Sequence, residues 1–130
     1  MSATIQSIEA ILVDIPTIRP HQLSMTTMAV QTMVIVRMKD SNGIEGLGEA
    51  TTIGGLAYGP ESPESVKLTI DTYFAPLLIG QPADNINTLK VRLNGNTRGN
   101  NLAKSAIETA LLDMQGKRLN RPVSDLLGGA

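Results

Sequence analysis

Few residues of this sequence could take part in chemistry, and two of them share one segment. His21, the single histidine, follows Arg19 in the run Pro16-Thr17-Ile18-Arg19-Pro20-His21. Arg19 could hold a carboxylate through two parallel hydrogen bonds, whereas His21 has no second metal ligand beside it. Both residues could equally be exposed side chains of a surface loop, and the sequence leaves the two interpretations open.

A second segment is rich in glycine and reads Thr51-Thr52-Ile53-Gly54-Gly55-Leu56-Ala57-Tyr58-Gly59-Pro60. Adjacent glycines can cradle a phosphate, but no Gly-Lys-Ser or Gly-Lys-Thr follows here, and the next predicted helix starts several residues later. We therefore expect a flexible lid. Tyr58 within it would either contact a ligand or pack against a hinge, and both remain open.

The acids and lysines predict no catalytic residue and no metal site within the chain. The acids belong to separate predicted elements, and Glu45 and Glu49 are too far apart on one strand face to share a metal ion without other ligands. The sequence has no cysteine, which excludes a thiol nucleophile and a thiolate metal site. The acids considered were Glu9, Asp14, Glu45, Glu49, Glu61, Glu64, Glu108 and Asp113.

The composition predicts one small domain with an aliphatic core. The chain has 130 residues, of which 42% are hydrophobic and only 2% aromatic, and this length is typical of a single domain. Its net charge of −1 and its few aromatics argue against a nucleic-acid-binding protein. No apolar run is long enough for a membrane span, and the first residues do not resemble a secretory signal. We therefore expect a cytoplasmic protein.

Three strands are predicted in the first half of the chain, at residues 8–15, 32–39 and 44–51. The first is apolar on both faces. The pair Asn42-Gly43 supplies the positive φ of a tight hairpin between the second and third strands. Gly46 and Gly48 share one face of the third strand and would weaken it, unless another element packs unusually close there.

Helices are predicted in the second half. Ser62-Pro63-Glu64 has a capping hydroxyl, a proline and an acid in the order typical of a helix start. Ala103, Ile107, Ala110 and Met114 form an apolar stripe at helical spacing. The predicted helices are 62–78, from Asp84 or Asn85 to Leu93, 101–119, and a short turn at 123–127.

The order of these elements indicates an α+β fold, a three-stranded antiparallel meander followed by three to four helices. In that topology the connections 16–30 and 52–61 leave the sheet at the same end. Both are long for loops, and long ordered loops in small domains are often functional. The segments that hold His21 and Tyr58 are thus expected to be neighbours.

A long, gapped signature then links the chain to a known family. It reads Ala103-Lys104-Ser105-Ala106-Ile107-Glu108-Thr109-Ala110-Leu111-Leu112-Asp113-Met114-Gln115-Gly116-Lys117, followed by Pro122-Val123 and Leu126-Leu127-Gly128-Gly129. This signature resembles the N-terminal domain of the mandelate racemase/muconate lactonizing group of the enolase superfamily, although Met114 stands where smaller or branched apolar residues are more usual. Within that group, residues 13–21 and 49–59 resemble the two substrate-facing segments of the muconate cycloisomerases.

The resemblance implies a two-domain enzyme in which residues 1–130 form the N-terminal capping domain. A (β/α) barrel outside this chain would carry the divalent metal, Mn²⁺ or Mg²⁺, its acidic ligands and the catalytic lysines, so the chain alone is expected to be inactive. The family reaction interconverts cis,cis-muconate and muconolactone in catechol breakdown. Position by position, Ile53 and Tyr58 match substrate contacts, and His21 matches a position near the site.

Other functions share the same signature. A cap of a chloromuconate cycloisomerase or of a dipeptide epimerase would carry it, and so would an autonomous, non-catalytic interaction module with the same fold. The Thr-Thr-Ile-Gly-Gly run favours muconate over the epimerases. The expected partners are the chain's own barrel domain, a small dicarboxylate substrate and further copies in a homo-oligomer, with no nucleic acid and no membrane.

Overall fold

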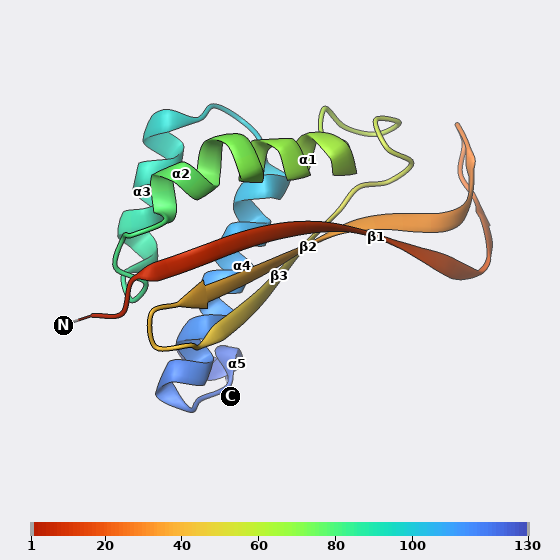
Figure 1. Cartoon of the computed structure of the whole chain (residues 1–130). Coiled ribbons are helices and arrows are strands. Elements are labelled where there is room, and N and C mark those ends of the chain that lie inside the picture. Colours follow the sequence, from red (N-terminus) through yellow and green to blue (C-terminus); the bar gives the residue numbers. More distant parts are fainter. Residues whose placement is uncertain (1, 130) are drawn as a thin grey trace.

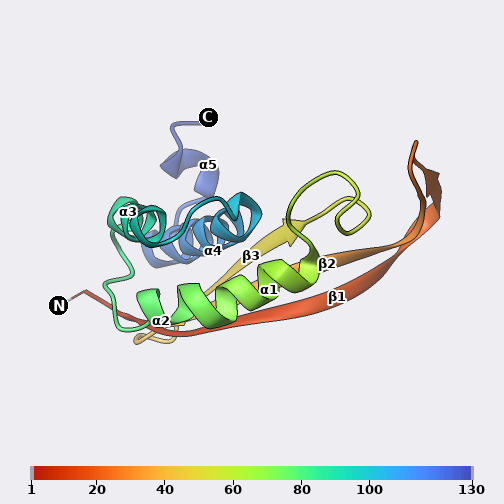
Figure 2. The same ribbon diagram turned by 90° about the horizontal axis from the view of Figure 1, so that it is seen from above.

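Three antiparallel strands in the order β1-β2-β3 form the sheet of this computed structural model, which describes residues 2–129 (Figure 1). The strands are β1 (Ile5–Gln22), β2 (Thr27–Asp40) and β3 (Glu45–Thr51). The helices follow in the chain, and α1 and α4 lie across the same face of the sheet (Figure 2). The predicted α+β meander is therefore confirmed.

The helices begin close to where the sequence predicts them. The first predicted helix is continuous but contains a π-helical segment, which ends two residues before Pro76. A proline cannot donate the usual backbone hydrogen bond and crowds the preceding turn, and a wider π turn accommodates this. Among residues 2–129, no helix is long and apolar enough to cross a membrane. The helices are α1 (Pro63–Thr69), η1 (Ile70–Phe74), α2 (Ala75–Leu78), α3 (Ile86–Asn96), α4 (Asn101–Leu119) and α5 (Val123–Leu126).

The core lies between the sheet and α4, where the two approach unusually closely. All four residues of the predicted apolar stripe of α4 are fully buried. A Cβ placed on Gly48 would collide with the carbonyl oxygen of Ala106, and one on Gly46 with that of Ala110. The two glycines of β3 are therefore required by the close packing of α4, as their positions predicted.

The connection predicted at 16–30 is wrong, because most of it is strand. β1 and β2 continue as a two-stranded hairpin beyond the end of β3, with Pro16 paired to Val30 and His21 to Met28. Only residues 23–26 separate the two strands. β1 is an edge strand, so the missing N–H groups of Pro16 and Pro20 do not interrupt a central ladder. The register shifts between Pro16 and His21.

Both edges of the sheet are covered by a lysine from a helix. Lys67 Nζ donates to the carbonyl oxygen of Ala10 at 2.7 Å on the β1 side. On the β3 side, Lys117 Nζ donates to the carbonyl oxygen of Glu45 at 2.8 Å, and Asp113 Oδ2 accepts the Leu47 N–H at 2.8 Å. Since exposed edges invite pairing with other chains, these contacts protect the sheet.

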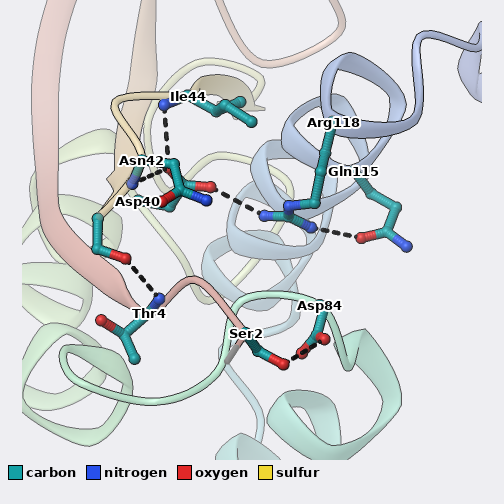
Figure 3. A network of polar contacts seen from close by, with 9 residues as sticks. Ser2, Thr4, Asp40, Asn42, Ile44, Asp84, Gln115 and Arg118 are labelled. Atoms are coloured by element: carbon teal, nitrogen blue, oxygen red, sulfur yellow. Dashed lines mark hydrogen bonds and ion pairs between the residues drawn. The ribbon is translucent and has the colours of Figure 1, made fainter.

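A buried carboxylate organises the turn between β2 and β3 (Figure 3). Asp40 is fully buried, and its Oδ1 accepts the N–H groups of Asn42 and Ile44, both at 2.9 Å. Its Oδ2 accepts a hydrogen bond from Arg118 Nη2 at 3.0 Å, and Arg118 also donates to Gln115. The turn is thereby tied to the last part of α4.

Candidate functional site

The two segments predicted to face a ligand meet at one end of the molecule, where the β1–β2 hairpin extends past β3 (Figure 1). The hydroxyl groups of Ser24 and Tyr58 lie 2.9 Å apart and form a hydrogen bond. Gln31 Nε2 donates to the carbonyl oxygen of Thr52 at 2.7 Å. The tip of the hairpin and the 52–61 segment therefore contact each other, as the topology predicted.

Two of the three predicted substrate residues border the same hollow. Ile53 and Tyr58 are 50% and 52% exposed, and they line a hollow of about 230 Å³ together with Glu61 and Leu102. His21 is exposed on β1 and does not line this hollow. The structure thus brings Ile53 and Tyr58 together, while the role of all three residues in binding stays a prediction.

Apart from Glu61, which lines the hollow and whose two oxygens are bound at the start of α4, the two segments at this end carry no acid. No acidic residue occurs between 15 and 39 or between 50 and 60, and these two segments contain Arg19 and His21. An anion approaching the hairpin tip would meet no like charge on them, so it would not be repelled there. Side chains of this kind can orient a ligand and exclude water, but they offer no paired acid and base for catalysis.

The acids of the described residues do not assemble a metal site. Within 2–129, no three His, Asp or Glu side chains are close enough to hold a metal ion together. Asp113 has a lowered pKa: partial burial alone raises it, but the hydrogen bonds from Lys117 and the Leu47 N–H, with the charge of Lys117, outweigh that effect. Asp113 belongs to the edge of β3 and not to the hollow.

Sequence reasoning missed the residues that hold the 52–61 segment in place, namely Ser24, Gln31 and Glu61. The first two contact Tyr58 and Thr52 as described, and Glu61 accepts hydrogen bonds from the start of α4. No sequence signal pointed to Glu61, because Asn100 directly before α4 is itself a common N-cap residue type. Only the structure, in which Asn100 has a left-handed backbone and forms no side-chain cap hydrogen bond, shows that the cap comes from elsewhere.

Comparison with known proteins decides the family. The model of the mandelate racemase / muconate lactonizing enzyme N-terminal domain matches residues 7–128. The chain belongs to this family. It is 61% identical to muconate cycloisomerase 1 of Pseudomonas putida over 98% of its own length and 35% of that protein. It is 43% identical to a chloromuconate cycloisomerase of Pseudomonas putida over 97% of its own length and 34% of that protein.

Solved structures agree with this assignment. The muconate lactonizing enzyme of Pseudomonas fluorescens, crystallised with muconolactone, superposes with a TM-score of 0.97 and 63% identity, over 99% of this chain and 35% of that one. The chain spans about a third of the length of these relatives. The comparisons give no support to the alternative prediction of an autonomous interaction module.

Proposed function

We propose that the chain is the capping domain of a muconate cycloisomerase and helps to enclose a small dicarboxylate substrate, cis,cis-muconate or muconolactone. The observation that carries this proposal is the level of similarity. Identity is 61% to a muconate cycloisomerase but 43% to a chloromuconate cycloisomerase of the same species. This difference favours the unchlorinated substrate.

The geometry supports a role in binding. Tyr58 and Ile53 are half exposed around one hollow, and the acid-free segments beside them carry Arg19 and His21. In our proposal the hairpin tip and the 52–61 segment cover the substrate, exclude water and orient its carboxylates, which strengthens electrostatic interactions inside the closed site. We assign no proton transfer to any residue of this chain.

The rest of the enzyme is also part of the proposal. We propose that a second domain, a (β/α) barrel, supplies the catalytic lysines and the acidic ligands of a divalent metal, Mn²⁺ or Mg²⁺, because the family resemblance implies both and residues 2–129 assemble no metal site. The metal would stabilise the negative charge of an enolate intermediate. We further propose a cytoplasmic homo-oligomer that acts in the breakdown of catechol.

A chimaera tests the proposal directly. Residues 1–130 replace the matching part of the Pseudomonas putida muconate cycloisomerase 1, and the loss of muconate absorbance is followed with Mn²⁺ present. We expect turnover comparable to that of the unmodified relative. A second chimaera with the cap of the Pseudomonas putida chloromuconate cycloisomerase is the matched control and should turn over muconate less well. A folded first chimaera without turnover would overturn the proposal.

A further inference from the structure

Helix α4 starts without a cap from its own segment. The residue before it, Asn100, has a left-handed backbone (φ 55°, ψ 44°) and forms no side-chain cap hydrogen bond. The first N–H groups of a helix have no partner within the helix and need one elsewhere. For α4 the partner is Glu61, whose Oε2 accepts the Leu102 N–H at 2.9 Å and whose Oε1 accepts the Ala103 N–H at 3.1 Å.

The charge of Glu61 is part of this contact. The side chain is buried, with 8% exposed, and it belongs to none of the ion pairs formed among residues 2–129. A buried carboxylate without a cation is costly, but the N-terminus of a helix carries a partial positive charge that stabilises an anion. Both oxygens are used, so neither a shorter acid nor a neutral amide reproduces the contact fully.

Glu61 also ends the segment that holds Ile53 and Tyr58. The next residue, Ser62, caps α1 through its side chain and backbone, so the chain is fixed on two helices at this point. The other end of the segment is held by the bond from Gln31 to Thr52. Between these ends, the bonds are a turn from Ala57 N–H to the Gly54 carbonyl oxygen and the exposed Ser24–Tyr58 contact. The middle of the segment therefore takes its position largely from its two ends.

We infer that Glu61 is a positioning residue for substrate binding: by capping α4 it sets where Ile53 and Tyr58 stand around their common hollow. The expected kinetic effect rests on the proposed function, whereas the expected change in the position of the segment does not. Loss of the cap would leave the C-terminal end of the segment held only by Ser62 at α1 and allow Tyr58 to move. Because groups that bind a substrate must be held in a defined geometry, a displacement of Tyr58 should weaken substrate binding and lower kcat/KM.

The test compares Glu61→Gln with Asn85→Ala in the chimaera described above. Asn85 caps α3 through its side chain, so its loss weakens a helix start that lies outside the 52–61 segment. Both variants should lower the Tm by a few degrees. We expect Glu61→Gln to reduce kcat/KM for muconate about tenfold, mainly through a higher KM, and Asn85→Ala to leave both constants unchanged. Glu61→Asp should recover part of the loss.

Hydrogen exchange of the amides at 54–58 gives a readout that does not depend on activity. We expect faster exchange there in Glu61→Gln and parental rates in Asn85→Ala. Equal exchange and equal kinetics for the two variants would overturn the inference and reduce Glu61 to a cap of α4. If the parent chimaera is inactive while Glu61→Gln still speeds exchange, the proposed function fails and the anchoring role of Glu61 stands.

Discussion

The two ends of the sheet differ in how they are stabilised. Where α1 and α4 cover the sheet, Val36 and Met38 of β2 and Ile107 and Met114 of α4 are fully buried. At the hairpin end the sheet narrows to β1 and β2, and Ile18, Met25 and Leu56 are 106%, 67% and 65% exposed. Packing against the helices stabilises the covered part of the sheet. At the hairpin end, apolar side chains stay exposed and can contact another molecule or domain.

This difference separates the substitutions that damage folding from those that damage binding. Changes in the helix-covered part should lower the free energy of unfolding, because they create cavities, clashes or unpaired buried charges. Changes at the hairpin end should leave that free energy almost unchanged and act on the activity of the full enzyme. Four substitutions, at Asp40, Gly48, Asp113 and Tyr58, test this division and should affect stability in that decreasing order.

The largest effect should come from the buried ion pair of the β2–β3 turn. Asp40→Ala leaves Arg118 without its carboxylate partner and two turn N–H groups without an acceptor, and should cost about 4 kcal/mol. Arg37→Met is the matched control, since it removes an exposed pair with Glu45 on the same sheet. Urea unfolding measures both. A loss for Asp40→Ala no greater than that for Arg37→Met would contradict the structural role of the buried pair.

A side chain at Gly48 should be nearly as damaging. Gly48→Val forces β3 away from α4, because its Cβ would meet the Ala106 carbonyl oxygen, and we expect a loss of about 3 kcal/mol. Gly95→Ala serves as the control, as this helical glycine has open space around it and the change should be neutral or slightly stabilising. Thermal unfolding of the two variants decides the point, and a stable Gly48→Val protein would refute the close contact.

A smaller effect is expected at the edge of β3. Asp113→Asn weakens the contacts to Leu47 and Lys117 and should cost about 1 kcal/mol at pH 7. Because the folded-state pKa of Asp113 is lowered, the carboxylate stabilises the folded state above about pH 4. This stabilisation is lost as the pH falls through the folded-state pKa.

The difference between Asp113→Asn and the parent should therefore shrink when urea unfolding at pH 7 is repeated at pH 3. Asp125→Asn, which removes a longer contact to Arg121 at 3.7 Å, is the control and should change stability less. A difference that stays constant with pH would show that the charge of Asp113 does not contribute.

The smallest effect on stability, with a visible effect on function, is expected at Tyr58. Tyr58→Phe removes an exposed hydrogen bond to Ser24 and should change the free energy of unfolding by no more than about 0.5 kcal/mol. In the chimaera, however, we expect a reduced kcat/KM for muconate. If stability falls sharply while the kinetics stay the same, Tyr58 belongs to the structural part of the molecule and not to the binding part.

Local sequence signals predicted most of the elements well. The Ser62-Pro63 start and the stripe of α4 correspond to observed features, and of the two caps considered for α3, Asp84 and Asn85, the structure has Asn85. The failure lies at 16–30, which was expected to be a connection but continues β1 and β2, since an edge strand tolerates prolines. Whether a strand lies at the edge or in the centre of a sheet depends on the strand order, and no local pattern in the sequence of β1 indicates it.

The sequence alone determined the family, the order of strands and helices, and the close approach of some element to Gly46 and Gly48, because these depend on side-chain type and spacing along the chain. Only the tertiary structure decided how the 52–61 segment is held. Glu61 caps a helix that begins 40 residues later in the chain, and Ser24 meets Tyr58 across the hairpin tip. Such contacts arise when distant segments are brought together by packing, so their partners cannot be read from either segment alone.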